Sequence, residues 1–236
     1  MNKWLQTKLR PMLGSIGRER FPKLYKMYEK LFWSIVIRIK NRALHKSGYE
    51  CLREVEKVLN DAKISYFITY GTLLGIIREG KFIAHDNDID ISVLDINDFS
   101  WSNLEKVLKT IGLVKKHQFI LDGEITEQTY KKGNLSIDFF MSKIENGNSI
   151  TYFYLRDENH SYKTKNEFLV RQGITSPIVK TKLYKCKAGI FRVPSNAEGF
   201  LEEVYGANWR VPDPNWEGTS AIIEGRRGYM EKADNA

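Results

Sequence analysis

The sequence predicts an α/β fold, with a small mixed sheet flanked by helices and a basic amphipathic helical segment at its start. Apolar residues at helical spacing alternate along the chain with runs of β-branched and aromatic residues, a pattern typical of mixed structure. The 236 residues suffice for one moderately large domain with its own hydrophobic core. The net charge of +8 gathers in residues 1–40, which separates this segment from a main domain at 41–236.

Residues 1–40 form the basic segment. They contain ten Lys or Arg and two Glu, so the rest of the chain is balanced in charge. A nucleic-acid-binding domain carries positive charge over its own surface, so this distribution argues against nucleic acid as a partner. No secretory signal is evident in residues 1–13. The two cysteines, Cys51 and Cys186, form no metal or disulfide motif, which favours a reducing, cytoplasmic setting.

From Pro22 onward, the apolar residues of the basic segment recur at helical spacing, which predicts an amphipathic helix. Its longest apolar run is far below the roughly 20 residues that span a bilayer. Trp4, Trp33 and nearby lysines are residues with which interfacial helices bind anionic lipid. We expect a helix that lies on the inner face of a bacterial membrane, or else one that packs on the domain or on a second subunit. The apolar positions are Leu24, Tyr25, Tyr28, Leu31, Phe32, Ile35, Val36 and Ile39.

A second helical stretch, residues 43–62, precedes the first expected strand at Tyr66–Tyr70, whose residues are β-branched or aromatic. Gly71 and Thr72 then break this run before the apolar residues of a short helix. The N-terminus of that helix would offer free backbone N–H groups and the Thr72 hydroxyl to a phosphate. An ordinary strand-to-helix turn with a threonine cap is the alternative.

Asp86, Asp88 and Asp90 are spaced by two residues, which is the period of a strand. Their carboxylates would share one face, while Ile91 and Val93 enter the core from the other. Like charges about 4 Å apart repel by roughly 4 kcal/mol at an effective dielectric near 20, so such a cluster requires raised pKa values or a bound cation. Oxygen ligands beside a phosphate favour Mg²⁺ or Mn²⁺ over zinc. A solvated acidic loop is the alternative.

Asp138 is the one charged residue in an apolar strand expected at Asn134–Met141. An unpaired carboxylate would be costly to bury there, whereas a carboxylate directed at the same metal ion would be satisfied. The sequence therefore predicts Asp88, Asp90 and Asp138 as metal ligands. An edge-strand aspartate that faces solvent is the alternative for Asp138.

Helix and strand patterns account for most of the remaining chain. Ser195 and Glu198 have the capping-box spacing of a helix start. The polar stretch 156–181 is interpreted as a mobile substrate loop, and the tail from Pro212 as a loop. We expect a helix at 97–112 and strands at 113–121, 124–131, 134–141, 150–155 and 182–193.

Taken in order, these motifs resemble the LicD family of the nucleotidyltransferase-fold superfamily, which includes fukutin and fukutin-related protein. The resemblance spans about residues 48–215. Two departures bear on how a donor would fit: His85 stands where the family usually has Trp, and Asn87 where it often has Asp. The matching residues are Gly71-Thr72-Leu73-Leu74-Gly75, Arg78, Phe82-Ile83, Asp86, Asp88-Ile89-Asp90-Ile91, Asp138 and the C-terminal motif Ser195–Trp209.

The resemblance implies a nucleotidyltransferase-like fold and a metal-dependent phosphotransferase. Such an enzyme moves a phospho-alcohol group, for example phosphocholine or a polyol phosphate, from a CDP-activated donor to a cell-surface glycan. The expected acceptor is lipid-linked, as in a capsule, lipopolysaccharide or teichoic acid. Two alternatives stay open: a nucleotidyltransferase that moves NMP from NTP to a hydroxyl or sugar phosphate, and a non-catalytic membrane-binding module.

Roles for the individual residues follow from this function. Asp88 and Asp90 would hold Mg²⁺ or Mn²⁺ on the donor diphosphate, because neutralising the leaving nucleotide is the main need of phosphoryl transfer. Gly71 and Thr72 would bind a phosphate oxygen, and Arg78 is a candidate for donor charge. The remaining carboxylates, Asp138 and Asp86, would complete the metal shell or accept the proton of the acceptor hydroxyl, and the sequence does not divide these two roles.

Overall fold

The computed structural model of the chain describes residues 22–96, 98–156, 166–213, 216 and 218–233. Most of the basic segment, including Trp4, lies outside these ranges, as does the 157–165 part of the expected substrate loop. The elements are α3 (Pro22–Asp61), β1 (Tyr66–Ile68), α4 (Tyr70–Glu79), β2 (Ile89–Leu94), α5 (Trp101–Thr110), β3 (Val114–Leu121), β4 (Glu124–Lys132), β5 (Leu135–Glu145), β6 (Asn148–Leu155), β7 (Glu167–Thr175), β8 (Thr181–Cys186), β9 (Gly189–Pro194), α6 (Ala197–Tyr205) and β10 (Ala221–Lys232).

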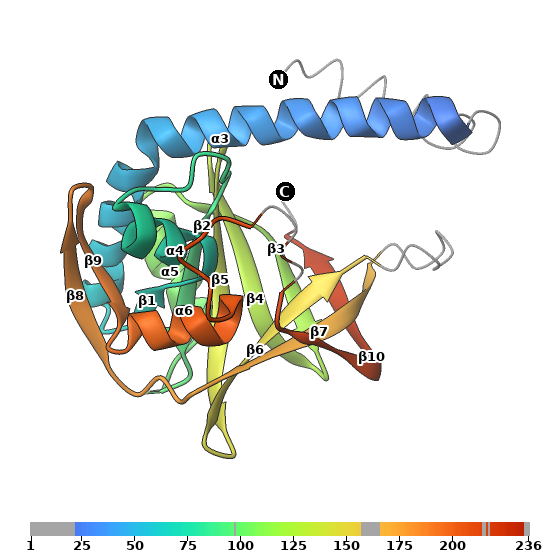
Figure 1. Ribbon diagram of the computed structural model, residues 1–236. Coiled ribbons are helices and arrows are strands. Elements are labelled where there is room, and N and C mark those ends of the chain that lie inside the picture. Colours follow the sequence, from blue (N-terminus) through green and yellow to red (C-terminus); the bar gives the residue numbers. More distant parts are fainter. Residues whose placement is uncertain (1–21, 97, 157–165, 214–215, 217, 234–236) are drawn as a thin grey trace.

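A large mixed sheet forms the centre of the molecule (Figure 1). Its strand order is β1-β2-β5-β4-β3-β10-β7-β6, and β6 also pairs with the end of β5, so the sheet curls back on itself. The β2–β5 pair is parallel, whereas the neighbouring pairs are antiparallel. The predicted α/β class is confirmed. The sheet is larger than the small one expected, because it has eight strands.

Two of these strands come from segments interpreted as loops. β7 lies in the expected substrate loop, and β10 lies in the tail from Pro212, so both interpretations are wrong for these residues. Most side chains of β10 are exposed or half-buried, and Gly225 and Gly228 interrupt its apolar residues. The sequence therefore lacks an alternating pattern there, and the strand is held by its backbone pairing to β3 and β7.

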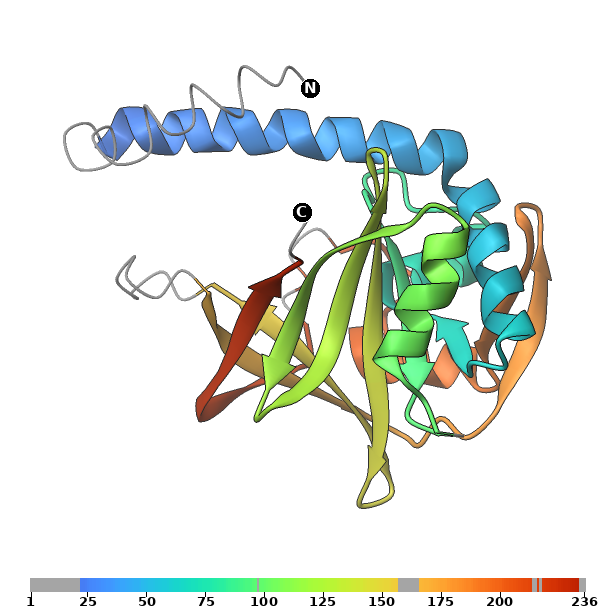
Figure 2. The same ribbon diagram turned by 180° about the vertical axis from the view of Figure 1, so that it is seen from behind.

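Helices cover both faces of the sheet. α6 lies in front of the sheet in Figure 1, and α5 lies in front of it in Figure 2, which is seen from behind. The predicted alternation along the carboxylate strand is confirmed on its core side, where Ile89, Ile91 and Val93 are fully buried. These three side chains belong to one hydrophobic core with α3, α4 and α5. The strand therefore has a buried apolar face and a face that carries Asp90.

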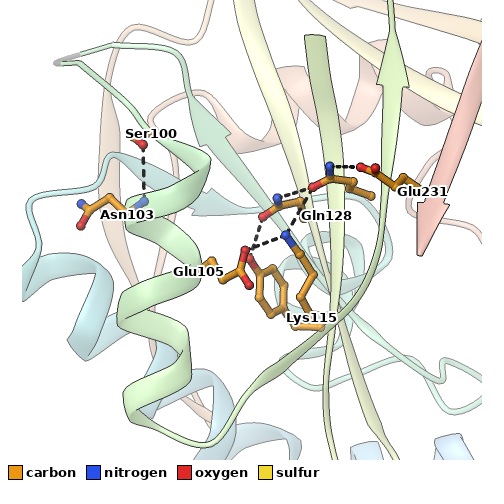
Figure 3. Close-up of polar contacts among 8 residues, drawn as sticks. Ser100, Asn103, Glu105, Lys115, Gln128 and Glu231 are labelled. Atoms are coloured by element: carbon orange, nitrogen blue, oxygen red, sulfur yellow. Dashed lines mark hydrogen bonds and ion pairs between the residues drawn. The ribbon is translucent and has the colours of Figure 1, made fainter. Parts of the chain in front are cut away.

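A chain of polar side chains lies on the sheet face that α5 covers (Figure 3). Gln118 Nε2 donates to Glu231 Oε2 at 2.6 Å, and Gln128 Nε2 donates to Gln118 Oε1 at 2.9 Å. Lys115 Nζ forms an ion pair with Glu105 Oε2 of α5 at 2.6 Å. Strands β10, β3 and β4 are thus linked to one another and to α5 by side chains as well as by backbone.

The two helical stretches expected at the start of the chain form one continuous helix, α3, which crosses residue 40 without a break. Its second half is part of the core, where Leu44, Leu52 and Val55 are fully buried. Its first half extends beyond the body of the molecule (Figure 2), and Met27 and Leu31 there are more than 60% exposed. None of the described helices is both long and apolar enough to cross a bilayer.

The last helix, α6, begins one residue later than expected. Asn196, rather than Ser195, caps it, because the Asn196 side chain accepts from the Gly199 N–H at 3.2 Å. The Ser195 hydroxyl instead donates to the Lys180 carbonyl oxygen at 2.6 Å. Asn and Ser cap helices about equally well, so the two neighbours could not be separated from the sequence.

Candidate active site

The start of α4 forms one wall of the site. β1 ends at Ile68, Thr69 has extended backbone, and Tyr70 opens the helix with a φ of +42°. A left-handed backbone is unusual for a residue with a bulky side chain, and such strain is concentrated at functional sites. The helix therefore starts about one residue before the expected turn, and Gly71 and Thr72 lie in its first turn.

Gly71 lets two carboxylates approach this helix end. A Cβ atom at Gly71 would lie 3.0 Å from Asp86 Oδ2 and 3.3 Å from Asp90 Oδ2, closer than ordinary contacts. Backbone N–H groups of a first helical turn carry partial positive charge and stabilise nearby anions. The predicted anion site at Gly71 thus faces the protein's own carboxylates.

Thr72 fixes the strand that carries Asp90. Its hydroxyl accepts a hydrogen bond from the Asp90 N–H at 2.9 Å, and the Thr69 N–H donates to the Asp90 carbonyl oxygen at 3.1 Å. The backbone of Asp90 is therefore held on both sides by the β1–α4 junction. A phosphate contact for the Thr72 hydroxyl stays a prediction.

Asp138 lies next to Asp90, because the two are register partners on the parallel strands β5 and β2. The Thr129 hydroxyl of β4 donates to Asp138 Oδ1 at 2.5 Å. Strand β5 has β2 on one side and β4 on the other, so the edge-strand alternative for Asp138 is wrong. Asp90 and Asp138 thus come together as the sequence predicted.

Helix α3 holds the loop that carries Asp86 and Asp88. Asn41 Nδ2 donates to the carbonyl oxygens of Ala84 at 2.8 Å and Asp86 at 2.6 Å. Lys40 Nζ lies 3.8 Å from Asp88 Oδ2 and donates to Asn87 Oδ1 at 3.2 Å. Strand β2 begins at Ile89, so Asp88 lies just before the strand and not within it. The loop that carries Asp88 is held by these contacts with α3.

Burial raises the pKa of all four aspartates, and the charge of a neighbouring aspartate raises it further for Asp86, Asp90 and Asp138. Burial raises the pKa of Asp90 well above its ordinary value, and the charges of Asp88, Asp138 and Asp86 add to this effect. The pKa of Asp86 rises to about 6, mainly by burial and then by the Asp88 charge. Burial and Asp88 likewise raise the pKa of Asp138 to about 6. Burial raises the pKa of Asp88 also, against the opposing charge of Lys40. The cluster is short of positive charge.

Four residues at the site were not predicted from the sequence to belong to it: Lys40, Asn41, Thr129 and Glu127. Glu127 is buried on β4, where burial and the Asp138 charge raise its pKa well above the ordinary value. Alternation along β4 places Glu127 and Thr129 on one face. An isolated buried charge in that strand was the one signal that could have identified Glu127.

The possible metal ligands are carboxylate oxygens, and little positive charge lies near them. Such a donor set suits a hard divalent cation such as Mg²⁺ or Mn²⁺. Asp86 and Asp90 converge on Gly71, and Asp138 adjoins Asp90. Among the described residues, no group of three or more His, Cys, Asp or Glu side chains is arranged so that it could hold a metal ion. The chemistry therefore fits a cation, and the coordination itself stays a prediction.

Arg78 lies at the far end of α4. Its guanidinium contacts Glu79 Oε1 at 2.8 Å and the Trp209 carbonyl oxygen at 3.5 Å. Its Nε atom is buried and has no hydrogen-bond partner within the described residues. The Arg78 charge acts on Asp86, whose pKa it lowers against the effect of burial. Arg78 is thus near the carboxylates, and its role toward a donor stays a prediction.

A cavity of about 330 Å³ opens beside Asp90. Tyr70 forms its aromatic wall with Phe140 and Phe153, each 5.1 Å from the Tyr70 ring centre and steeply inclined to it. Phe200 of α6 adds a fourth ring, with its centre 6.2 Å from that of Tyr70. Hydroxyl groups complete the lining on Ser92, Ser142, Ser149 and Thr151. Asp90 thus lies at the edge of a cavity large enough for a small organic group.

A mixed sheet that presents these carboxylates beside a helix start defines an α/β domain of the nucleotidyltransferase class. Residues 63–184, just over half of the chain, match the family model described as LicD/FKTN/FKRP, nucleotidyltransferase domain. The chain belongs to this LicD family, as the motifs indicated. Asp86, Asp88, Asp90 and Asp138 all lie within the matched range.

Curated relatives include the human and mouse proteins named "Ribitol-5-phosphate transferase FKTN". The chain is 23% identical to the Homo sapiens protein over 180 residues, covering 74% of this chain, and 22% identical to the Mus musculus protein over 181 residues, covering 75% of this chain. The matches cover 36% of each relative, so the chain spans about a third of their length. Among solved structures, the chain is similar to the crystal structure of ANT(2")-Ia in complex with adenylyl-2"-tobramycin. The match covers 44% of this chain and 55% of the ANT(2")-Ia chain, with 14% sequence identity and a TM-score of 0.35.

Proposed function

We propose that this protein transfers a phospho-alcohol group from a CDP-activated donor to a glycan. The observation that carries the proposal is the convergence of Asp86 and Asp90 on Gly71, with Asp138 in register beside Asp90. Family membership and the activity for which the curated relatives are named support the same reaction class. A ribitol phosphate donor is the first to test, because those relatives are named for it.

The four carboxylates divide into two roles in this reaction. Asp88, Asp90 and Asp138 would hold Mg²⁺ or Mn²⁺, which when bound would neutralise charge on the donor diphosphate. Thr72 and Asn41 keep the backbone of Asp90 and Asp86 in place through the hydrogen bonds described above. Asp86, with its pKa of about 6, can accept a proton from an acceptor hydroxyl near neutral pH.

The cavity beside Asp90 supplies a place for the organic part of the donor. Aromatic faces such as Tyr70 and Phe153 stack on planar rings, and the surrounding hydroxyl groups can bond to ring or ribose atoms. We assign the cavity to the nucleoside, which would place the diphosphate at Asp90. Substitution of Phe153 by Ala should then raise the KM for every CDP-alcohol alike.

Product analysis separates the proposal from nucleotidyl transfer, which the family description also favours. The protein is incubated with Mg²⁺, a lipid-linked glycan and CDP-ribitol, CDP-choline, CDP-glycerol or CDP-ethanolamine in turn. The proposal expects CMP release that depends on the glycan. Pyrophosphate released from an NTP, with no CMP from any CDP-alcohol, would establish the nucleotidyltransferase instead.

We also propose that the first half of α3 binds an anionic membrane surface, where a lipid-linked acceptor would be found. Met27, Leu31 and Trp33 are 50–64% exposed on the extending half of this helix. Lys23, Lys30 and Arg38 add cationic groups to the same half. Exposed apolar side chains beside lysines match the chemistry of interfacial helices, and each cation contributes up to about 1 kcal/mol near anionic lipid.

Liposome flotation tests this second proposal. The full chain should float with anionic vesicles, less so at high salt, whereas a chain that starts at Asn41 should remain in the soluble fraction. A Met27→Ser/Leu31→Ser variant should lose flotation while keeping its melting temperature, because both side chains are exposed in the free protein. Equal partitioning of all three chains would identify the exposed apolar side chains of this half of α3 as a packing or dimer surface.

A further inference from the structure

A row of side chains connects the carboxylates with a basic region on the same face of the sheet. Directly paired residues of neighbouring strands project to the same side. The register runs from Asp90 to Asp138, Thr129, His117 and Lys232, across β2, β5, β4, β3 and β10. Strands lie about 4.8 Å apart, so the backbone of Lys232 is about 14 Å from that of Asp138. The row is acidic at one end and basic at the other.

Further lysines surround the basic end. Lys131 has the same parity as Thr129 on β4 and therefore points to the same face, and Lys116 adjoins His117 at an irregularity in the β3–β4 register. Burial lowers the pKa of His117 to about 4, and the charges of Lys131, Lys40 and Lys232 act in the same direction. Burial lowers the pKa of Lys131, and the charges of Lys40 and Lys116 act in the same direction. These lysines thus lie near one another around His117.

Among the described residues, Asp138 is the acidic side chain whose charge acts on Lys131 of this basic end, and it forms no ion pair with it. Lys115, on the opposite sheet face, is paired with Glu105 (Figure 3), and Lys40 lies near Asp88. In the part of the chain that the structure describes, Lys116, Lys131 and Lys232 have no ion-pair partner. Like charges held together repel one another, and an anionic ligand removes that cost.

We propose that this basic cluster, made of Lys116, Lys131 and Lys232 around His117, binds a phosphate group of a substrate. The inference rests on the proposed function in one respect, since it takes the ligand to be a substrate of the neighbouring carboxylates. Lysine ammonium groups bind phosphate as point charges. The phosphate belongs either to the donor diphosphate or to a phosphorylated acceptor glycan.

Calorimetric titration with inorganic pyrophosphate, in buffer free of divalent metal, tests the binding step without turnover. The wild-type chain should bind pyrophosphate, and the Lys131→Gln/Lys232→Gln variant should bind it about tenfold more weakly. Lys182→Gln is the matched control, because Lys182 is exposed on the separate β8–β9 sheet. The double variant should melt no lower than the wild type, because the substitutions relieve repulsion. Equal affinity for the wild type and the double variant would overturn the proposal, as would a wild type that does not bind.

Steady-state kinetics of CMP release then identifies the source of the phosphate. A higher KM for the CDP-alcohol in the double variant assigns the phosphate to the donor, and a higher KM for the glycan assigns it to the acceptor. The Lys131→Arg variant should have a KM close to that of the wild type, because arginine keeps the positive charge. Unchanged KM values for both substrates would overturn the inference and leave the proposed function intact. If pyrophosphate binding depends on the lysines but no CDP-alcohol supports transfer, the phosphate site is supported and the proposed function is refuted.

Discussion

Substitution of Gly71 by alanine should separate activity from stability. The added Cβ would lie 3.0 Å from Asp86 Oδ2 and 3.3 Å from Asp90 Oδ2, whereas ordinary contacts begin at 3.4 Å. Asp86 must therefore retreat by about 0.4 Å and Asp90 by about 0.1 Å. Misplacement of a reacting group by about 1 Å can cost about 100-fold in rate, so we expect turnover to fall by about five- to tenfold.

The stability of the Gly71→Ala variant should stay close to that of the wild type. Alanine favours a helix over glycine by up to about 1 kcal/mol, which offsets the new crowding. Gly75→Ala is the contrast on the same helix, because its Cβ would lie 2.6 Å from the Lys81 carbonyl oxygen and 2.9 Å from the Ile83 nitrogen. Such backbone contacts should destabilise that variant by roughly 1–3 kcal/mol.

Thermal melts and CMP release per folded molecule measure the two effects. The expected result is a nearly normal melting temperature with reduced turnover for Gly71→Ala, and a lowered melting temperature for Gly75→Ala. A Gly71→Ala protein that unfolds like Gly75→Ala, while its folded fraction turns over normally, would refute the reasoning. Gly71 would then be a packing glycine, and the approach of the two carboxylates would be unrelated to catalysis.

Three further outcomes are expected. Asp88→Asn and Asp90→Asn should each abolish Mg²⁺-dependent turnover while the melting temperature holds or rises, because carboxylate repulsion is relieved; normal turnover or unfolding would contradict the metal assignment. Asn41→Ala should lower kcat more than KM, since it removes both hydrogen bonds to the carboxylate loop, and Asn41→Asp, which cannot donate when ionised, should match it. Burial holds the pKa of His117 at about 4, below its ordinary 6.5. Between these two pH values the unfolded chain binds more protons than the folded chain, so the free energy of unfolding falls as the pH drops through this window. Denaturant melts of His117→Gln should show a smaller decline than those of the wild type, and an equal decline would exclude His117 as the cause.

The carboxylates could be predicted because their pattern is local. Asp88 and Asp90 are separated by two residues, and the apolar residues between and after them fix which side faces the core. Asp138 was identifiable because burial of a lone charge requires compensation. Their meeting required one further fact, the parallel pairing of β2 with β5, which the sequence pattern does not contain and the structure provides.

The support of the site could not be predicted, because it depends on contacts between distant segments. Asn41 and Asp86 are 45 residues apart, and nothing in a polar residue of a helix reveals which carbonyl oxygen it will meet. Lys40 carried the pattern of a surface cation and was assigned to lipid, yet its ammonium lies 3.8 Å from Asp88. β10 has an equally non-local origin, since its partners β3 and β7 come from the middle of the chain.

The two faces of β2 explain how the fold tolerates its own active site. Ile89, Ile91 and Val93 are fully buried on one face, and each such side chain contributes roughly 1.5–3 kcal/mol. Repulsion between two carboxylates about 4 Å apart is roughly 4 kcal/mol at an effective dielectric near 20, so the apolar face of this one strand outweighs it. The register is thereby fixed, because a shift of one residue would turn Asp90 into the apolar core and move all three apolar side chains to the face that carries the carboxylates. The same strand that anchors the core therefore holds Asp90 against the helix end in the charged arrangement that an incoming cation or proton would stabilise.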